Sequence, residues 1–345
     1  MRKLVCSAAV CATAGMAHAA TVPTVADVSY GPYEPAERQT LDFYVPDGVD
    51  APPIVMWIHG GAWYAGDKSS PTGVQEFLDA GIAVASMNYR LTTYDGPPSP
   101  DTANGTTWPG QLEDITNAFA FVRDSGETYG YDGSRVASFG ASAGAHLSAW
   151  AGLALADDPD TRLAATVAWY PPTDLIEMDA DDDASSPDLD VIEHLACDSP
   201  ESLLVGACLG ETDGMGDLVN QGFADAASPA IFASFLPEDT VLPAFLIMHG
   251  DEDPLVSYLQ SVRLFDAIDV QGGSPDLQLR ILEGLGHGGP GWEEQVPDVV
   301  DFMDAAFAVQ PAPVPVPAAL PMTLAGLGML TAFGCRRKAS APRLT

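Results

Sequence analysis

A serine stands between small residues in the segment Gly140-Ala141-Ser142-Ala143-Gly144, which follows a short apolar run and precedes an alanine-rich stretch. A serine at the tip of a sharp strand-to-helix turn has an exposed hydroxyl, and small neighbours let backbone pass close to backbone there. Such a serine attacks a carbonyl carbon once a base has removed its proton. We therefore predict that Ser142 is the nucleophile of an acyl-transfer reaction.

The base is expected downstream, because in this kind of site the chain order is serine, acid, histidine. The histidines after Ser142 are His146, His194, His249 and His287. The first should pack within the helix after Ser142, the second lies in a segment without strands, and the third ends a strand and shapes a turn. His287 lies in a glycine-lined loop after the last predicted strand, and it is the predicted base.

The acid that orients this base is Asp251, Glu252 or Asp253, which stand together between a predicted strand and a predicted helix. We favour Asp253 over Asp251. It directly precedes Pro254, which suits the first position of a helix, and a carboxylate there can point across the sheet edge towards the histidine loop.

Acyl transfer also needs N–H donors for the oxyanion that forms. The turn after the apolar run 54–58 reads His59-Gly60-Gly61-Ala62-Trp63. Its small residues let backbone N–H groups face inwards, so we predict an oxyanion hole from Gly60, Gly61 and Ala62, completed by the amide of Ala143.

His59 is expected to be structural. Trp63 is predicted to line the acyl pocket, and neither a metal nor a cofactor is required.

The elements that position these residues are short apolar strands separated by helical stretches. The predicted strands cover residues 54–58, 82–86, 136–139, 166–170, 245–248 and 277–282, and the predicted helices include residues 111–123, 143–155 and 255–268. Strands that are apolar on both faces and alternate with helices predict an α/β fold: a mostly parallel, twisted sheet with helices on both faces. One domain over residues 20–310 is long enough to bury such a sheet.

Residues 174 to about 240 interrupt this alternation, with many glycines and the acidic run 179–183. An insertion at the carboxyl edge of such a sheet commonly forms a lid over the ligand crevice. We expect the acidic run to be a solvated face rather than a calcium site. Cys197 and Cys208 also lie here, and a disulfide between them is predicted.

Both ends of the chain differ from the middle. Residues 1–19 have a basic start, a short apolar segment and the ending Ala17-His18-Ala19, which is typical of a cleaved secretory signal. Residues 311–345 contain a proline-rich linker, an uncharged stretch at 318–335 and the basic cluster at 336–338. With Val-Pro-Val-Pro-Ala at 314–318, this end resembles PEP-CTERM-type sorting signals, which implies an exosortase as partner. The alternative is a permanent single-span anchor.

The formal net charge is −34, and six of the 14 basic residues lie in these two ends. The middle therefore carries eight basic and 48 acidic residues, a net charge of −40. Such a surface repels nucleic acid and anionic membranes, so no nucleic-acid partner is expected, and membrane contact is expected only through the C-terminal segment.

Together these segments resemble the α/β-hydrolase branch that includes hormone-sensitive lipase, kynurenine formamidase and feruloyl-esterase-like carboxylesterases. Further stretches that match the last group are Asn-Tyr-Arg-Leu at 88–91, Gln-Leu-Glu-Asp at 111–114, Ser-Pro-Glu-Ser-Leu-Leu at 199–204 and Ala-Ser-Pro at 227–229. The resemblance covers roughly residues 38–308 and departs from the family at 176–197 and around Cys208.

The resemblance implies a serine carboxylesterase that acts on a small-molecule or polysaccharide-linked ester, without a cofactor, and the signal-like residues 1–19 predict that it is exported. An aryl-formamide amidase is the second hypothesis, since the same three residues cleave both bonds. A surface binding module without turnover is the third, because a fold alone does not guarantee activity.

Overall fold

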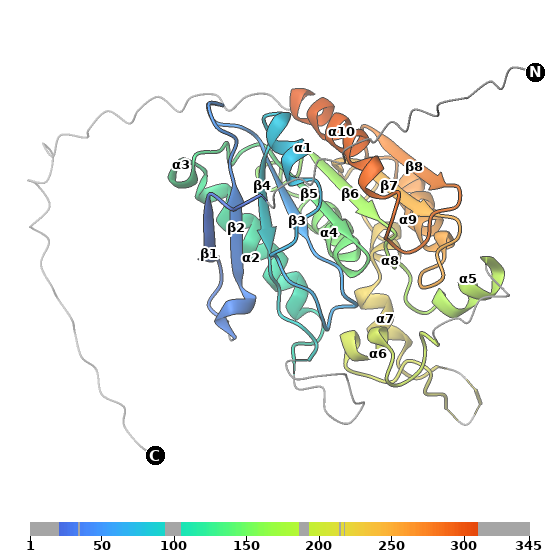
Figure 1. Cartoon of the computed structure of the whole chain (residues 1–345). Helices are drawn as coiled ribbons and strands as arrows, with labels where there is room; N and C mark the ends of the chain where they lie inside the picture. Colours follow the sequence, from blue (N-terminus) through green and yellow to red (C-terminus); the bar gives the residue numbers. More distant parts are fainter. Residues whose placement is uncertain are drawn as a thin grey trace, which may run out of the picture. The chain divides into compact units, whose positions relative to one another are not determined.

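The computed structural model describes residues 21–33, 35–93, 105–185, 193–213, 215–216 and 218–309. In this part of the chain, eight strands form one sheet in the order β1-β2-β4-β3-β5-β6-β7-β8 (Figure 1). The strands are β1 (Val25–Ser29), β2 (Thr40–Tyr44), β3 (Ile54–Ile58), β4 (Ala83–Met87), β5 (Val136–Ala141), β6 (Ala165–Trp169), β7 (Ala244–Gly250) and β8 (Leu277–Leu282).

The six strands from β3 to β8 are parallel to one another, and the β1–β2 and β2–β4 pairs are antiparallel. These six parallel strands correspond to the six predicted from sequence, and every strand end lies within two residues of its predicted position. The antiparallel edge was not predicted, since β1 is short, contains Asp27 and is mostly exposed, and β2 carries a charged residue, Asp42. Asp42 lies in the sheet because the buried Lys68 ammonium is 2.6 Å from its carboxylate.

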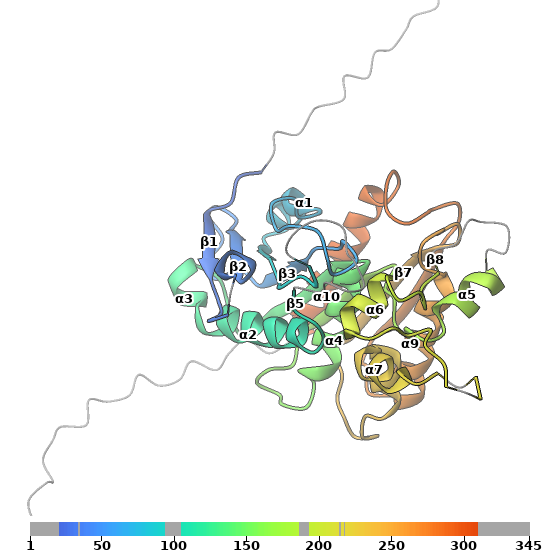
Figure 2. The same cartoon turned by 90° about the horizontal axis from the view of Figure 1, so that it is seen from below.

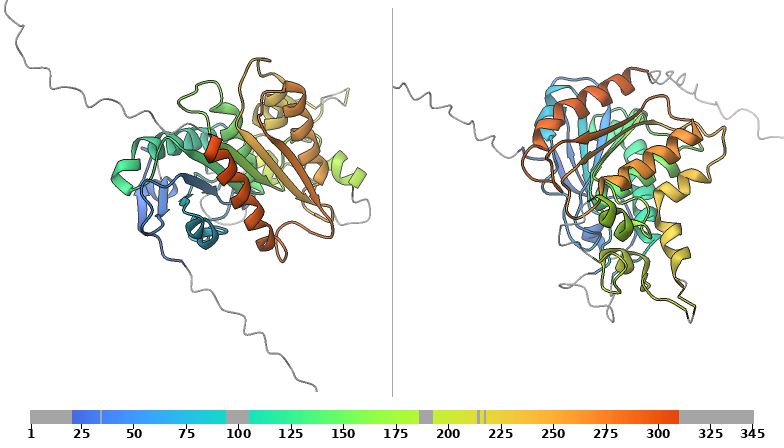
Figure 3. Two further views of the ribbon diagram at one scale, coloured as in Figure 1. Left: turned by 90° about the horizontal axis from the view of Figure 1, so that it is seen from above. Right: turned by 90° about the vertical axis from the view of Figure 1, so that its right-hand side faces the viewer.

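Helices cover both faces of the sheet. They are η1 (Ala36–Arg38), α1 (Val74–Asp79), α2 (Gly110–Asp124), α3 (Gly126–Tyr129), α4 (Ala143–Ala154), α5 (Met178–Ser185), α6 (Pro200–Val205), α7 (Gln221–Ala227), α8 (Pro229–Ser234), α9 (Tyr258–Gln271), η2 (Glu293–Gln295) and α10 (Val296–Val309). Helices α1 and α10 pack on one face, and α2, α4, α8 and α9 lie on the other (Figure 3). The predicted class, a mostly parallel sheet between helical layers, is confirmed.

Successive side chains of each strand point to opposite faces of the sheet, so alternate residues enter different parts of the core. In β3, Ile54, Met56 and Ile58 pack beneath α2 and α4, whereas Val55 and Trp57 pack beneath α1 and α10. All five side chains are buried, which is why this run is apolar without alternation.

The insertion after β6 contains α5, α6, α7 and α8 and no strand among its described residues. Helices α6 and α7 lie together beyond one end of the sheet, below it in Figure 1 and towards the viewer in Figure 2, whereas α5 lies to their right and packs on α9. Helix α8 instead packs on α4 and α9 with buried alanines, and so extends the helical layer of the core.

Some predictions fall outside the described residues, namely the signal segment 1–19 and the C-terminal segment 311–345. The predicted domain boundaries stay predictions. Among the described residues, no helix has both the length and the apolar character needed to cross a membrane.

Candidate active site

The corner between β5 and α4 holds Ser142 in a conformation that side chains rarely adopt, with φ 55° and ψ −126°. Two glycines make the corner possible. A Cβ atom on Gly140 would lie 2.1 Å from the carbonyl oxygen of Gly144, and one on Gly144 would lie 2.1 Å from that of Ile58. Both contacts are with backbone and cannot relax, so larger side chains are excluded and the serine hydroxyl projects from the turn.

The structure brings the three predicted catalytic side chains into one hydrogen-bonded chain. Ser142 Oγ lies 2.9 Å from His287 Nε2, and His287 Nδ1 lies 2.8 Å from Asp253 Oδ2. Because a carboxylate only accepts, Nδ1 carries the proton and Nε2 is free to accept the one on Ser142. These residues are 145 and 34 positions apart in sequence, and they meet because the carboxyl ends of parallel strands share one sheet edge.

The Asp253 side chain is completely buried, and both of its carboxylate oxygens accept hydrogen bonds. Its Oδ1 accepts the backbone N–H groups of Leu255 and Val256, at 2.9 and 3.0 Å. Burial alone would raise the pKa of the Asp253 carboxyl, but the histidines at 249 and 287 outweigh burial and hold this pKa well below its usual range. Asp251, the alternative acid, is partly exposed and accepts the backbone N–H of Gly284 instead.

The loop after β3 lies against this corner, where Gly60 abuts Ala141 and Ser142. Gly61 and Ala62 have positive φ values of 113° and 51°, which turn the backbone sharply. Within the described part of the chain, the N–H groups of all four predicted donors are bonded to no backbone or side-chain acceptor; these residues are Gly60, Gly61, Ala62 and Ala143. They are therefore free to bind an oxyanion, and this role stays a prediction.

His59 and Tyr89 contact each other and the backbone of this loop. The two rings stack at 4.4 Å between centroids, the Tyr89 hydroxyl donates to the carbonyl oxygen of His59, and His59 Nδ1 lies 2.7 Å from that of Gly60. Burial lowers the pKa of His59 to about 4, so the ring is neutral at ordinary pH. These contacts fit the expected structural role.

Trp63 lies in the core, with 1% of its surface exposed. Its indole N–H donates to His146 Nδ1 at 3.2 Å, and His146 Nε2 in turn donates to the carbonyl oxygen of Ala227 at 2.7 Å. Trp63 thus connects the oxyanion loop to the end of α7 in the insertion. Its predicted place in the acyl pocket stays a prediction.

Tyr170 is a site residue that the sequence did not single out. It follows β6 with a φ of 44°, and its ring lies 4.6 Å from the ring of His287 and 4.5 Å from that of Trp292. The Trp292 indole donates to the carbonyl oxygen of Gly286, next to His287. Tyr170 therefore packs on the imidazole directly, and Trp292 contacts Tyr170 and the backbone next to His287. An aromatic residue after an apolar strand is too common to have revealed this.

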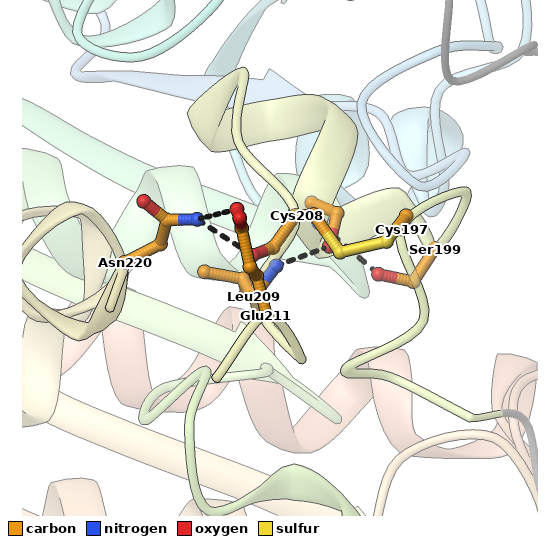
Figure 4. Close-up of a disulfide and its surroundings, with 7 residues drawn as sticks. Cys197, Ser199, Cys208, Leu209, Glu211 and Asn220 are labelled. Atoms are coloured by element: carbon orange, nitrogen blue, oxygen red, sulfur yellow. Dashed lines mark hydrogen bonds between the residues drawn. A yellow bond between two sulfur atoms is a disulfide. The ribbon is translucent and has the colours of Figure 1, made fainter. Parts of the chain in front are cut away.

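The predicted disulfide between Cys197 and Cys208 is present in the insertion, and it closes a loop that contains α6 (Figure 4). Inside this loop the Ser202 hydroxyl accepts the N–H of Leu209, and on its far side the Asn220 amide donates to the carbonyl oxygen of Cys208. The loop is thus held by one covalent link and several hydrogen bonds.

The acidic run in α5 is solvated only in part, since Asp183 is exposed but two other carboxylates of the run are buried. Asp181 and Asp182 are each only 4% exposed. Asp181 binds Arg263 at 2.6 Å, and Asp182 binds the buried His194 at 3.1 Å. The prediction is wrong for these two residues because their cationic partners come from other segments. No cluster of acidic, histidine and cysteine side chains suited to a metal ion occurs among the described residues.

His194 lies between two buried carboxylates, Asp182 and Glu201, each 3.1 Å away. Burial alone would lower the pKa of His194, but these two partners outweigh it and raise the pKa to about 10. The charged ring therefore joins α5 to α6 beside the disulfide.

Comparison with known proteins identifies the family to which the chain belongs. The sequence profile of the BD-FAE family matches residues 41–268, which include Ser142, Asp253 and the loop after β3. The chain belongs to the BD-FAE family. His287 lies beyond the matched region.

Relatives of this BD-FAE chain include esterases. Esterase LipQ of Mycobacterium tuberculosis is 27% identical over 271 residues, which cover 74% of this chain and 56% of that protein. The probable carboxylic ester hydrolase LipM of the same organism is 28% identical over 256 residues, covering 70% and 51%. The chain thus spans about half the length of these curated relatives.

Solved structures similar to this BD-FAE chain have the α/β-hydrolase fold. A truncated carbohydrate esterase from gut microbiota superposes with a TM-score of 0.64 and 25% identity, over 82% of this chain and 96% of that one. Esterase B from Lactobacillus rhamnosis superposes with a TM-score of 0.58 and 20% identity, over 84% and 88%. The predicted α/β-hydrolase fold is confirmed.

Proposed function

We propose that this BD-FAE protein is a serine carboxylesterase that hydrolyses carboxylic esters through an acyl-enzyme on Ser142. The observation that carries the proposal is the hydrogen-bonded chain from Ser142 Oγ through His287 to Asp253. Its esterase relatives support the same reaction class.

In the proposed reaction, His287 Nε2 removes the Ser142 proton as Oγ attacks the ester carbonyl carbon. The buried Asp253 carboxylate stabilises the imidazolium that forms. The free N–H groups of the oxyanion hole, which come from Gly60, Gly61, Ala62 and Ala143, bind the negative oxygen of the tetrahedral intermediate. His287 then gives its proton to the leaving alcohol, and a water molecule releases the acid by the same steps in reverse order.

We propose a small-molecule or polysaccharide-linked ester as substrate. The polysaccharide alternative is supported by the similarity to a carbohydrate esterase. Ser142 and His287 are partly exposed, so an ester can reach them from solvent.

We further propose that the protein is exported. The signal-like residues 1–19 support this, as does the disulfide, because disulfides persist in oxidising compartments. Export machinery, and an exosortase acting near residues 314–318, are the proposed partners. The intact mass of protein from the producing cell tests this: loss of residues 1–19 is expected, and a chain retaining them would refute export.

A fluorophosphonate probe tests the proposed chemistry, because it phosphonylates only an activated serine. We expect one equivalent of probe on the peptide that contains Ser142, parallel loss of activity on a short-chain nitrophenyl ester, and no labelling of Ser142→Ala. A folded wild-type protein that neither reacts with the probe nor cleaves the ester would favour a non-catalytic binding module.

A further inference from the structure

His249, at the end of β7, is fully buried and makes two hydrogen bonds. Its Nε2 lies 2.8 Å from the carbonyl oxygen of Val256, and its Nδ1 lies 2.7 Å from the Ser261 hydroxyl. Because a carbonyl oxygen only accepts, Nε2 carries the proton, and Nδ1 accepts from Ser261. Both ring nitrogens are thus satisfied in a single orientation.

The same ring touches the catalytic acid in two ways. Nε2 lies 3.2 Å from Asp253 Oδ2, the oxygen that also meets His287. The carbonyl that His249 binds belongs to Val256, and the amide of this residue donates to the other carboxylate oxygen, Oδ1. The His249 ring therefore contacts the Asp253 carboxylate directly. It also binds the turn whose backbone amide donates to that carboxylate.

The groups that face the His249 ring are Asp253, Ser261, the Val256 carbonyl and Tyr170, whose ring centroid lies 6.4 Å away. The Tyr170 ring also contacts His287, so aromatic packing and hydrogen bonding act on the same pair of imidazoles. His249 has no contact with Ser142 or with the oxyanion loop, and its side chain is closed to solvent.

We propose that His249 is a positioning residue for the catalytic acid, which fixes the Asp253 carboxylate so that Oδ2 meets His287 Nδ1. This inference rests on the proposed esterase function. Since the His249 ring is closed to solvent and lies 3.2 Å from the Asp253 carboxylate, it acts on the reaction through Asp253. Its loss therefore lowers kcat and leaves KM unchanged.

Two amide substitutions form a matched pair. In His249→Gln the terminal amide nitrogen reaches the place of Nε2 and can still donate to Val256 and approach Asp253. In His249→Asn the shorter amide ends near the place of Nδ1, beside Ser261, and leaves the carboxylate side empty. Hydrogen bonds to charged groups stabilise by an amount equivalent to about ten- to hundredfold in rate, so we expect such a loss of kcat in the Asn variant and recovery of most of it in the Gln variant.

The decisive measurement repeats His249→Asn in an Asp253→Ala background, with thermal unfolding of every variant as the check on folding. If His249 acts through Asp253, the Asn substitution costs no further activity there, and the two losses are far from additive. The proposal is overturned if folded His249→Asn keeps wild-type kcat, raises KM alone, or loses the same factor in both backgrounds. Absence of esterase activity in the wild-type protein would instead refute the proposed function.

Discussion

Replacing Asp253 by asparagine should lower kcat by roughly 30-fold to 10⁴-fold, for a reason that the hydrogen bonds make explicit. Asp253 Oδ1 accepts the amides of Leu255 and Val256, and Oδ2 accepts the proton of His287 Nδ1. An amide side chain has one accepting oxygen and one donating nitrogen, so it cannot serve both sides.

If the asparagine oxygen stays with the backbone amides, its NH₂ group faces His287 Nδ1. The imidazole proton then moves to Nε2, where it points at Ser142 and blocks proton transfer. If the amide turns over, its NH₂ group meets the two backbone N–H donors and both lose their acceptor. Each buried donor left unpaired costs about 1–3 kcal/mol, so the productive orientation lies about 2–6 kcal/mol higher. At about 1.4 kcal/mol for each factor of ten, this gives the stated range.

The N–H of His249 reduces the free-energy difference between these two orientations of the asparagine amide only in part, because its hydrogen bond goes to the carbonyl oxygen of Val256. Asp251→Asn is the matched control. Its Oδ1 accepts one N–H, from Gly284, and an asparagine oxygen can keep that bond. We expect kcat within about threefold of wild type, because no ionised group depends on this acceptor. Both variants are assayed on a short-chain nitrophenyl ester, with circular dichroism to verify folding. A folded Asp253→Asn protein with more than a tenth of wild-type kcat would refute the reasoning, as would equal damage from Asp251→Asn.

Further predictions concern the nucleophile, the insertion and the C-terminus. Ser142→Ala should lose about 10⁴–10⁶ in turnover with an unchanged melting temperature, and a rate above a few per cent of wild type would contradict its role. The raised pKa of His194, about 10 against 6.5 when unfolded, means that its stabilisation is complete below pH 6.5 and is lost as pH rises through 10. The protection factors of the amides in residues 193–211, which correct for the intrinsic rise of exchange rate with pH, should therefore fall over this range, and His194→Gln should abolish the change. Reduction of the Cys197–Cys208 disulfide should remove roughly 2–3 kcal/mol from the insertion and alter substrate preference, while the melting of the sheet, followed by far-ultraviolet circular dichroism, stays in place. A chain ending at Val309 should keep full esterase activity and be released from the cell envelope, and a folded but inactive truncated protein would contradict a purely addressing role for residues 311–345.

Local sequence was enough to indicate the corner at Ser142, since a glycine-serine-glycine corner between an apolar run and an alanine-rich stretch needs only near neighbours to form. The six parallel strands were equally predictable, because both of their faces are buried and their runs are apolar throughout. The carboxyl ends of such strands share one edge, so Ser142, Asp253 and His287 could be expected to meet, and the structure brings them within hydrogen-bond distance. Their roles stay predictions.

The tertiary structure alone decided which charges are buried and which rings support the site. Asp182 pairs with His194, and Tyr170 packs on His287, across 12 and 117 positions of sequence. His249 is only four residues from Asp253, yet its contact depends on how the turn at 253–256 folds back over the end of β7. An ionised or aromatic side chain looks the same in sequence whether it meets water or a partner, because the free energy that decides its burial comes from groups that only folding brings near.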